Sequence, residues 1–142
     1  MPVRKAQAEW KGDLKSGHGN VTTESGTLFS PYSFSSRFEE GTGTNPEELI
    51  GAAHSACFAM AFSHALASAG FPPTAVKAED KVFIEKIGDG FSITKIEITC
   101  EGWVPKIDAA TFQKIAEEAK TNCPVSKALA GTKLILQATL KS

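Results

Sequence analysis

The chain has 142 residues, 42% of them apolar, and a formal net charge of −1. This length is enough for one domain with a buried core and too short for two ordinary domains, so we expect a single domain over residues 1–142. A nearly neutral chain without a block of lysines or arginines offers no electrostatic surface for nucleic acid, and we expect no such partner.

Strand-like and turn-like segments alternate in the first quarter of the chain. Residues 5–11, 17–24 and 28–38 are predicted to form three strands, because β-favouring stretches are separated there by short turns that contain glycine. The polar, glycine-rich residues 41–44 then lead out of the third strand.

A long helix is predicted next, over residues 46–69. Asn45 is a good N-cap, proline suits the first helical position, and Gly70 marks the end. Residues 49–70 are nearly free of charge and long enough to span a bilayer, but Ala, Ser, Gly and two histidines make a poor membrane anchor. We therefore expect the buried central helix of a soluble protein, and no membrane partner.

The remaining segments complete an α+β pattern. A Gly-Asp-Gly turn at residues 88–90 indicates a hairpin between two long strands, and Asp108 is a suitable cap for a second helix. The elements predicted here are strands at residues 76–87 and 91–104, a helix after Asp108, a short helix at 124–129 and a strand at 133–140. The predicted order is βββ-α-ββ-αα-β.

The N-terminal sequence and the cysteine count indicate the redox environment. No apolar stretch follows the basic residues near Met1, so we expect no signal peptide and a cytoplasmic protein. A reducing cytosol disfavours a lasting structural disulfide but is compatible with a transient catalytic one. The three cysteines, Cys57, Cys100 and Cys123, leave one unpaired, which also argues against a disulfide scaffold.

Cys57 lies in the middle of the alanine-rich helix. The default interpretation is a small core residue, since free cysteine is among the most buried residue types. A reactive thiolate would need a cation from elsewhere in the chain, because the helix dipole acts only in the first turn. His54, one turn earlier, is either a base for this thiol or, as is more common, a polar residue that lines a buried helix.

Cys123 precedes Pro124, which can be the first residue of the short helix. As the N-cap, Cys123 would face exposed N–H groups that stabilise a thiolate, so spacing alone favours it as the nucleophile; a cysteine that merely occupies a turn is the equal alternative. Cys100 shares a strand face with two isoleucines, and core packing is expected there. Cys57 and Cys123 together suggest a reversible disulfide.

Charged residues near the first helix have ordinary interpretations. Arg37, near the end of the third predicted strand, is typical of a solvated edge, and Glu47 and Glu48 in the first helical turn favour the helix dipole. No Cys-x-x-Cys, His-x-x-x-His or acidic cluster with ligand spacing is present, so we expect no metal site.

Two longer motifs carry more information than these single residues. Thr44–Phe58 and Asn122–Ser126 closely resemble the OsmC/Ohr family of thiol-dependent hydroperoxide reductases, and most closely its OsmC (osmotically inducible protein C) branch. The resemblance covers essentially the whole chain, including Ala8–Asp13, Phe91–Ile96 and Leu140–Ser142.

This resemblance reverses the preferences drawn from the residues alone. It implies that Cys57 is the peroxidatic cysteine and Cys123 the resolving one, with Arg37 and Glu47 beside the reactive thiolate, and it gives His54 no catalytic role. It also implies an OsmC-like α+β fold built as an interwoven, swapped homodimer around central buried helices.

The resemblance also implies the reactants. Organic hydroperoxides, and to varying degrees hydrogen peroxide, are the implied substrates, and small dithiols or lipoylated proteins the implied reductants, with no metal, flavin or haem. An alternative from another class is a redox-sensing or ligand-binding module that does not turn over. Several aromatic residues are expected to line an apolar entrance for the substrate, namely Phe29, Phe34, Phe38, Phe58 and Phe62.

Overall fold

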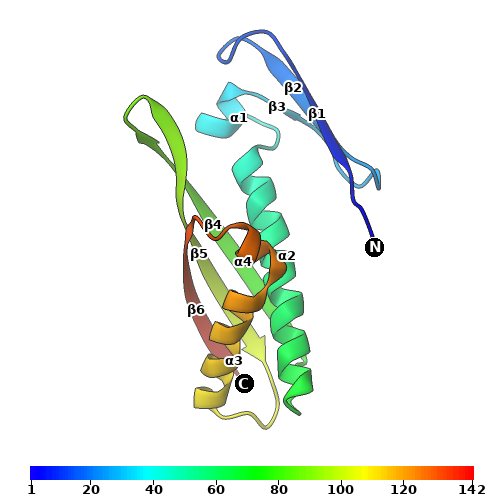
Figure 1. The fold of residues 1–142 in the computed structure, drawn as a ribbon, viewed down its shortest axis with the longest axis vertical. Coiled ribbons are helices and arrows are strands. Elements are labelled where there is room, and N and C mark those ends of the chain that lie inside the picture. The colour runs from blue at the N-terminus through cyan, green and yellow to red at the C-terminus, as the bar shows by residue number, and fades with distance from the viewer. The chain divides into compact units, whose positions relative to one another are not determined.

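The computed structural model describes residues 1–142, which form two compact units, Met1–Leu49 and Ile50–Ser142. A single domain over residues 1–142 remains a prediction. Figure 1 shows the elements along the chain. Their order is βββ-αα-ββ-αα-β, which differs from the predicted order by one short helix.

The first unit contains a small antiparallel sheet in the order β1-β2-β3. Its strands are β1 (Ala6–Lys11), β2 (His18–Thr23) and β3 (Phe29–Tyr32), which confirms three strands in this region. Tyr32 and Trp10 pack ring against ring, with centroids 5.2 Å apart.

The predicted strand over residues 28–38 is wrong in its second half. β3 ends at Tyr32, and Phe34–Phe38 form the helix α1. The cause is a reciprocal cap: the Ser36 backbone N–H donates to Ser33 Oγ (3.1 Å), while the Ser33 N–H donates to Ser36 Oγ (2.8 Å). Arg37 therefore lies on a helix and not at the end of a strand.

The long helix α2 (Pro46–Ser68) starts where the sequence predicts and ends one residue earlier than expected. Asn45 is confirmed as its cap, because Asn45 Oδ1 accepts a hydrogen bond from the Glu48 N–H (2.7 Å). By length and composition α2 could cross a membrane, and 28% of its most apolar stretch is buried in the single chain. Buried side chains recur every fourth residue along one face, at His54, Phe58, Phe62 and Leu66.

The second unit is built on a mixed sheet in the order β4-β5-β6. β4 and β5 form an antiparallel hairpin, whereas β6 lies parallel to β5. A parallel neighbour requires a crossover, and two helices provide it. The elements are β4 (Ala75–Ile87), β5 (Gly90–Trp103), α3 (Ala109–Asn122), α4 (Pro124–Ala128) and β6 (Lys133–Lys141).

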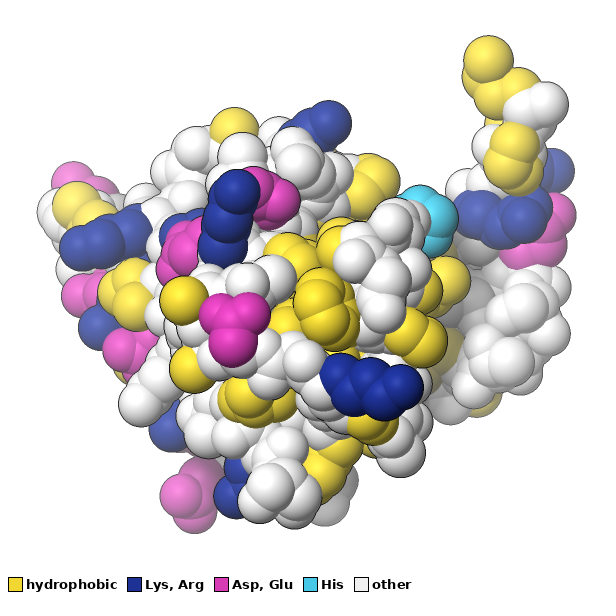
Figure 2. Space-filling view, turned by 90° about the horizontal axis from the view of Figure 1, so that it is seen from below, with side chains coloured by type: hydrophobic (Ala, Val, Ile, Leu, Met, Phe, Trp, Pro, Cys, Tyr) yellow, Lys and Arg dark blue, Asp and Glu magenta, His cyan; other side chains and the backbone are white.

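The core of the second unit lies where α2 and α3 meet the sheet. Phe62 packs on Phe112 of α3, with ring centroids 5.2 Å apart, and Ile98 of β5 is buried against the same cluster. Phe58 and Phe62 are fully buried in this core. The sequence-based expectation that these two residues line a substrate entrance is therefore wrong. Figure 2, which views the molecule from the lower end of Figure 1, shows further apolar side chains exposed among charged ones.

Candidate active site

The structure brings Cys57 and Cys123 into contact although 66 residues separate them. Cys57 lies in the middle of α2, and Cys123 is the residue that caps α4, as the sequence predicts. Both are free thiols, with Cys123 buried and Cys57 partly exposed, and their Sγ atoms are 2.8 Å apart. A disulfide bond is about 2.0 Å long. Small side-chain movements would therefore suffice to join these two cysteines.

The pKa values of the two thiols are shifted in opposite directions. Burial raises the pKa of Cys57, and its hydrogen bond with Cys123 raises that pKa further. Burial also acts to raise the pKa of Cys123, but hydrogen bonds from Cys57 and from the side chain and backbone of Ser126 outweigh it and lower that pKa. Within the second unit, the thiolate is therefore favoured on Cys123.

Cys100 has the structural role that the sequence predicts. Its side chain is fully buried on β5, where it belongs to the hydrophobic core. Burial, helped by the negative charge of Glu101, raises its pKa from 9.0 to about 12. A thiol with this pKa is protonated and unreactive at neutral pH.

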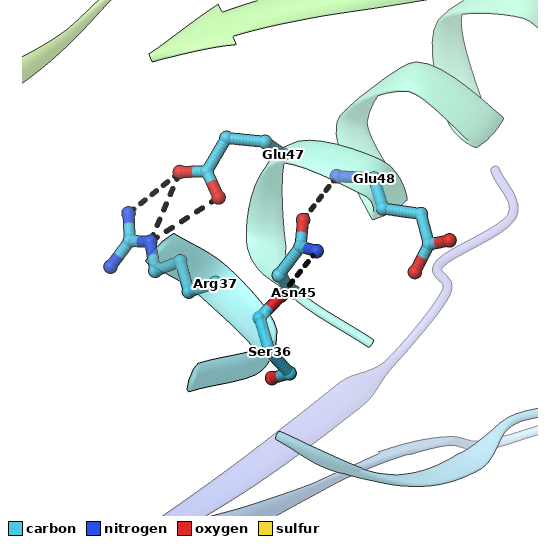
Figure 3. A network of polar contacts seen from close by, with 5 residues as sticks. All are labelled: Ser36, Arg37, Asn45, Glu47 and Glu48. Atoms are coloured by element: carbon cyan, nitrogen blue, oxygen red, sulfur yellow. Dashed lines mark hydrogen bonds and ion pairs between the residues drawn. The ribbon is translucent and has the colours of Figure 1, made fainter. Parts of the chain in front are cut away.

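Arg37 and Glu47 form a two-pronged ion pair within the first unit. Arg37 Nη2 lies 2.7 Å from Glu47 Oε1, and Arg37 Nε lies 3.1 and 3.2 Å from the two carboxylate oxygens (Figure 3). The Glu47 side chain is 7% exposed and that of Arg37 34% exposed. This geometry fixes the guanidinium in place and leaves Nη1 outside the three bonds.

Glu48, the neighbouring acid, has a different task. Its carboxylate accepts a hydrogen bond from Thr44 Oγ1 (2.8 Å), and its side chain points away from Arg37 (Figure 3). Asn45 ties the two helices of this region together, because its side-chain amide donates to the Ser36 carbonyl (3.0 Å). The sequence-based choice of Glu47 over Glu48 as the partner of the arginine agrees with this geometry.

A small aromatic cavity of about 170 Å³ lies beside Arg37 in the first unit. Phe34 and Phe38 line it, as expected for the entrance, whereas Phe29 is an exposed residue of β3 and does not line it. The other residues that line this cavity were not predicted from the sequence. They are Trp10, Leu14, Tyr32 and Ser33.

His54 takes part in a buried polar contact that the sequence analysis missed. Its Nδ1 is hydrogen-bonded to Asp80 Oδ2 on β4, and its Nε2 lies 2.8 Å from Ser126 Oγ on α4. The only sequence signal was that His54 and Ser126 fall inside the two motifs, Thr44–Phe58 and Asn122–Ser126, that contain the reactive cysteines, while Asp80 lies between two charged neighbours on a strand. No group of three or more His, Cys, Asp or Glu side chains is arranged to hold a metal ion.

An α+β chain with two free thiols in contact between the middle of one helix and the cap of another belongs to the class of dithiol redox proteins. The family model described as OsmC-like protein matches residues 39–137. The chain therefore belongs to the OsmC family.

Related sequences agree with this assignment. A protein of Escherichia coli (strain K12) named peroxiredoxin OsmC is 54% identical over 127 residues, which cover 89% of this chain and 89% of the relative. An organic hydroperoxide resistance protein, OhrB of Bacillus subtilis (strain 168), is 29% identical over 115 residues, which cover 80% of this chain and 82% of the relative.

Solved structures share the fold of this chain. The crystal structure of OhrB of Bacillus subtilis matches with a TM-score of 0.68 and 26% identity, covering 96% of this chain and 98% of that chain. An OsmC-like protein from Mycoplasma pneumoniae matches with a TM-score of 0.76 at 12% identity, covering 99% of both chains. The α+β OsmC-like fold, with two three-stranded sheets and central helices, is thereby confirmed.

Proposed function

We infer that this protein is a thiol-dependent hydroperoxide reductase that works through two cysteines. The observation that carries this inference is the 2.8 Å contact between Cys57 Sγ and Cys123 Sγ, in a chain 54% identical to a peroxiredoxin. A peroxidase of this kind needs one thiol that takes an oxygen atom from the peroxide and becomes a sulfenic acid. It also needs a second thiol within bonding reach, which forms a disulfide with the first so that the oxygen leaves as water.

In the proposed reaction Cys57 is the peroxidatic residue and Cys123 the resolving one. The Cys57 thiolate attacks the distal peroxide oxygen, the O–O bond breaks, and Cys57 sulfenic acid and an alcohol form. Cys123 then attacks the sulfenic sulfur, which forms the Cys57–Cys123 disulfide and releases water. An external dithiol reopens the disulfide by exchange.

Cys57 needs a cation to act first, because burial and Cys123 both raise its pKa. Arg37 is the residue we propose for this task. Its guanidinium is held by buried Glu47 and is one-third exposed, so it can pair with an anion that approaches. It would hold Cys57 as the thiolate and stabilise the negative oxygen of the leaving group.

We propose that this arginine comes from a second copy of the chain. Glu47 and Cys57 are ten residues apart on α2, and ten residues of a straight helix span roughly 15 Å. An arginine bound to Glu47 is thus too far along the helix to pair with the Cys57 of that helix. In an interwoven homodimer, the opening strands of one chain would cover the helix of the other.

The exposed face of α2 supports such a dimer. Opposite its buried residues, the helix exposes Ala52, Ala53, Ala56 and Met60, with Met60 75% exposed in the single chain. A helix with apolar side chains on every face is typical of burial on every face. A second copy of α2 would provide that burial and make α2 the central helix expected from the sequence.

The proposed substrates are organic hydroperoxides and hydrogen peroxide. The aromatic cavity beside Arg37 would hold the apolar part of an organic hydroperoxide and leave its O–O bond at the guanidinium. We propose a small dithiol or a lipoylated protein as the reductant, because exchange with two linked thiols releases a stable ring disulfide. A cytoplasmic location is part of this proposal.

Peroxide consumption under excess dithiol tests the proposal. We expect many equivalents of an alkyl hydroperoxide to be consumed per chain, and fewer of hydrogen peroxide in the same time. A sensor or binding module would stop after about one equivalent, because its disulfide is not reopened in a cycle. Such a stop with every dithiol tried would reject the proposal.

A further inference from the structure

A chain of buried polar groups connects β4, α2 and α4 in the second unit. Asp80 Oδ2 is hydrogen-bonded to His54 Nδ1, and His54 Nε2 lies 2.8 Å from Ser126 Oγ. Ser126 follows Cys123 by three residues in the first turn of α4, and its side chain and backbone act to lower the pKa of the Cys123 thiol. The side chains of Asp80 and His54 are 1% and 0% exposed. The chain of contacts therefore leads from a buried carboxylate to the Cys123 thiol.

Stability alone does not account for these residues. A buried carboxylate is costly unless its oxygens are paired, and Asp80 Oδ1 has no hydrogen-bond partner. Asp80 lies on the inner face of β4 between Ala78 and Val82, and its partner across the strands is Ile98. An apolar residue would suit this position better than a charge.

We propose that Asp80, His54 and Ser126 form a proton relay that accepts the thiol proton of Cys123 when Cys123 attacks oxidised Cys57. This inference rests on the proposed function and adds residues that take no part in the first step. Ser126 is the member nearest to the reacting thiol along α4, and in the proposed relay it takes the proton from Cys123 directly. His54 and Asp80 are positioning residues that act through Ser126.

The hydrogen-bond geometry sets the direction of transfer. With its ring proton on Nδ1, facing the Asp80 carboxylate, His54 accepts at Nε2 from the Ser126 hydroxyl. In the reduced chain the Cys123 S–H donates to Cys57 Sγ, and in the relay it turns to the lone pairs of Ser126 Oγ once Cys57 is oxidised. A shift of two protons gives the Cys123 thiolate, a Ser126 hydroxyl that donates to it, and a His54 imidazolium next to ionised Asp80. The pair Asp80–His54 stabilises the charge that this shift creates.

The resolving step balances with this relay. The Cys123 sulfur forms a bond to the Cys57 sulfur, and the S–O bond of the sulfenic acid breaks. The Cys57 sulfur is reduced and the Cys123 sulfur is oxidised. Hydroxide leaves Cys57, and the proton released by Cys123 returns from His54 to make one water. No further oxidant or reductant is required.

Few other titratable groups lie on the surrounding elements. The inner face of β5 carries Cys100, whose pKa of about 12 keeps it neutral. The charged neighbours of Asp80 on β4, Glu79 and Lys81, are exposed on the opposite face. On the buried side, His54 is hydrogen-bonded to Asp80 and Ser126, and Cys123 is the thiol that Ser126 follows on α4.

Single-turnover oxidation separates this relay from the first step. The dimeric protein is treated with one equivalent of an alkyl hydroperoxide, and Cys57 sulfenic acid and the Cys57–Cys123 disulfide are quantified by mass spectrometry after rapid quenching. In Ser126→Ala we expect sulfenic acid to form at the wild-type rate and the disulfide to form about 100-fold more slowly at pH 7. The deficit should shrink as the pH rises, because hydroxide then takes the proton directly.

Conservative variants separate the relay from packing. Ser126→Thr keeps the hydroxyl and should restore the disulfide rate to within a few fold. Asp80→Asn should act like Ser126→Ala, since an amide that donates to Nδ1 forces the ring proton onto Nε2, which can no longer accept from Ser126. His54→Gln should show the same deficit, while His18→Gln, at an exposed position of β2, should behave like the wild type.

Each outcome decides one question. Wild-type disulfide rates in Ser126→Ala and Asp80→Asn would overturn the relay while leaving the peroxidase intact. A deficit that does not change with pH, or that Ser126→Thr does not repair, would also overturn it, because misplacement of Cys123 by itself has that signature. Failure of the wild-type protein to form Cys57 sulfenic acid would instead reject the proposed function.

Discussion

Arg37 and Glu47 join α1 to the first turn of α2 through three hydrogen bonds of 2.7 to 3.2 Å. Because the carboxylate is buried and the guanidinium is one-third exposed, the pair presents a fixed positive group at the surface of the first unit. A cation that is already oriented loses little entropy when it binds an anion. This property suits the stabilisation of a thiolate and of a departing alkoxide.

Removal of this cation should slow peroxide reduction. Arg37→Ala is expected to lower kcat/KM for an alkyl hydroperoxide by about 100-fold and to raise the pH at which Cys57 reacts. Arg37→Lys should be intermediate, since an ammonium keeps the charge but loses the two-pronged geometry. Rates measured against pH, with the thiolate followed by its ultraviolet absorbance, check both effects.

Arg4→Ala is the matched control for this experiment. Arg4 is the other arginine of the chain, is exposed, and makes its hydrogen bond to the carbonyl of the adjacent Val3. Arg4→Ala should leave both kcat/KM and the pH dependence of Cys57 reactivity unchanged. An Arg37→Ala enzyme that equals this control would show that the arginine has been assigned wrongly.

The two reactive cysteines should fail in different ways. Cys57→Ser is expected to abolish peroxide reduction, whereas Cys123→Ser should still be oxidised at Cys57 and accumulate sulfenic or sulfinic acid there. Mass spectrometry after one equivalent of peroxide distinguishes the two. The pKa directions alone favour Cys123 as the thiolate, so turnover retained in Cys57→Ser, with oxidation on Cys123, would invert the roles.

Cys100 should make folding stability depend on pH in the alkaline range. Its pKa is about 12 in the folded chain and near 9.0 when unfolded, so the folded state binds this proton more tightly and stability falls as the pH rises above 9.0. The loss is at most about 1.4 kcal/mol per pH unit. Urea unfolding from pH 8 to 10.5 under reducing conditions should show a steeper decline for the wild type than for Cys100→Ala. Equal slopes would mean that Cys100 ionises without hindrance in the folded protein.

Local signals in the sequence were sufficient for most helix ends. Asn45 and Asp108 cap their helices as predicted, because a cap depends on residues only three positions away. The helix α1 was missed because both members of its reciprocal cap are serines, whereas the second member of such a cap is usually Glu or Gln. That signal was present in the sequence but weak.

Contacts between distant segments could not be predicted from patterns. The parallel pairing of β6 with β5 and the approach of Asp80 to His54 join residues far apart in the chain, and no local propensity specifies them. The resemblance to a family assigned Cys57 and Cys123 to one reaction, but it contained no reason to connect His54 with Ser126. Their contact spans 72 positions and became visible only in the fold.

Mixed dimers test whether the active site is shared between chains. Chains carrying Cys57→Ser and chains carrying Glu47→Ala are expected to be inactive or weakly active separately, and they are refolded together in equal amounts. If Glu47 and Arg37 serve the partner's thiol, each mixed dimer contains one intact site, formed by Glu47 of the first chain and Cys57 of the second. Half of the dimers are mixed at random pairing, so activity should reach about a quarter of the wild-type value per chain.

A matched mixture controls for refolding yield. Cys57→Ser chains combined with Cys123→Ser chains should not regain disulfide turnover, because Cys57 and Cys123 meet within one chain and no mixed dimer then has an intact pair. Recovery with Glu47→Ala but not with Cys123→Ser would therefore place the ion pair across the interface and the thiol pair within a chain. Activity of the first mixture no higher than that of its separate components would reject a shared site, since each chain would then need its own Glu47.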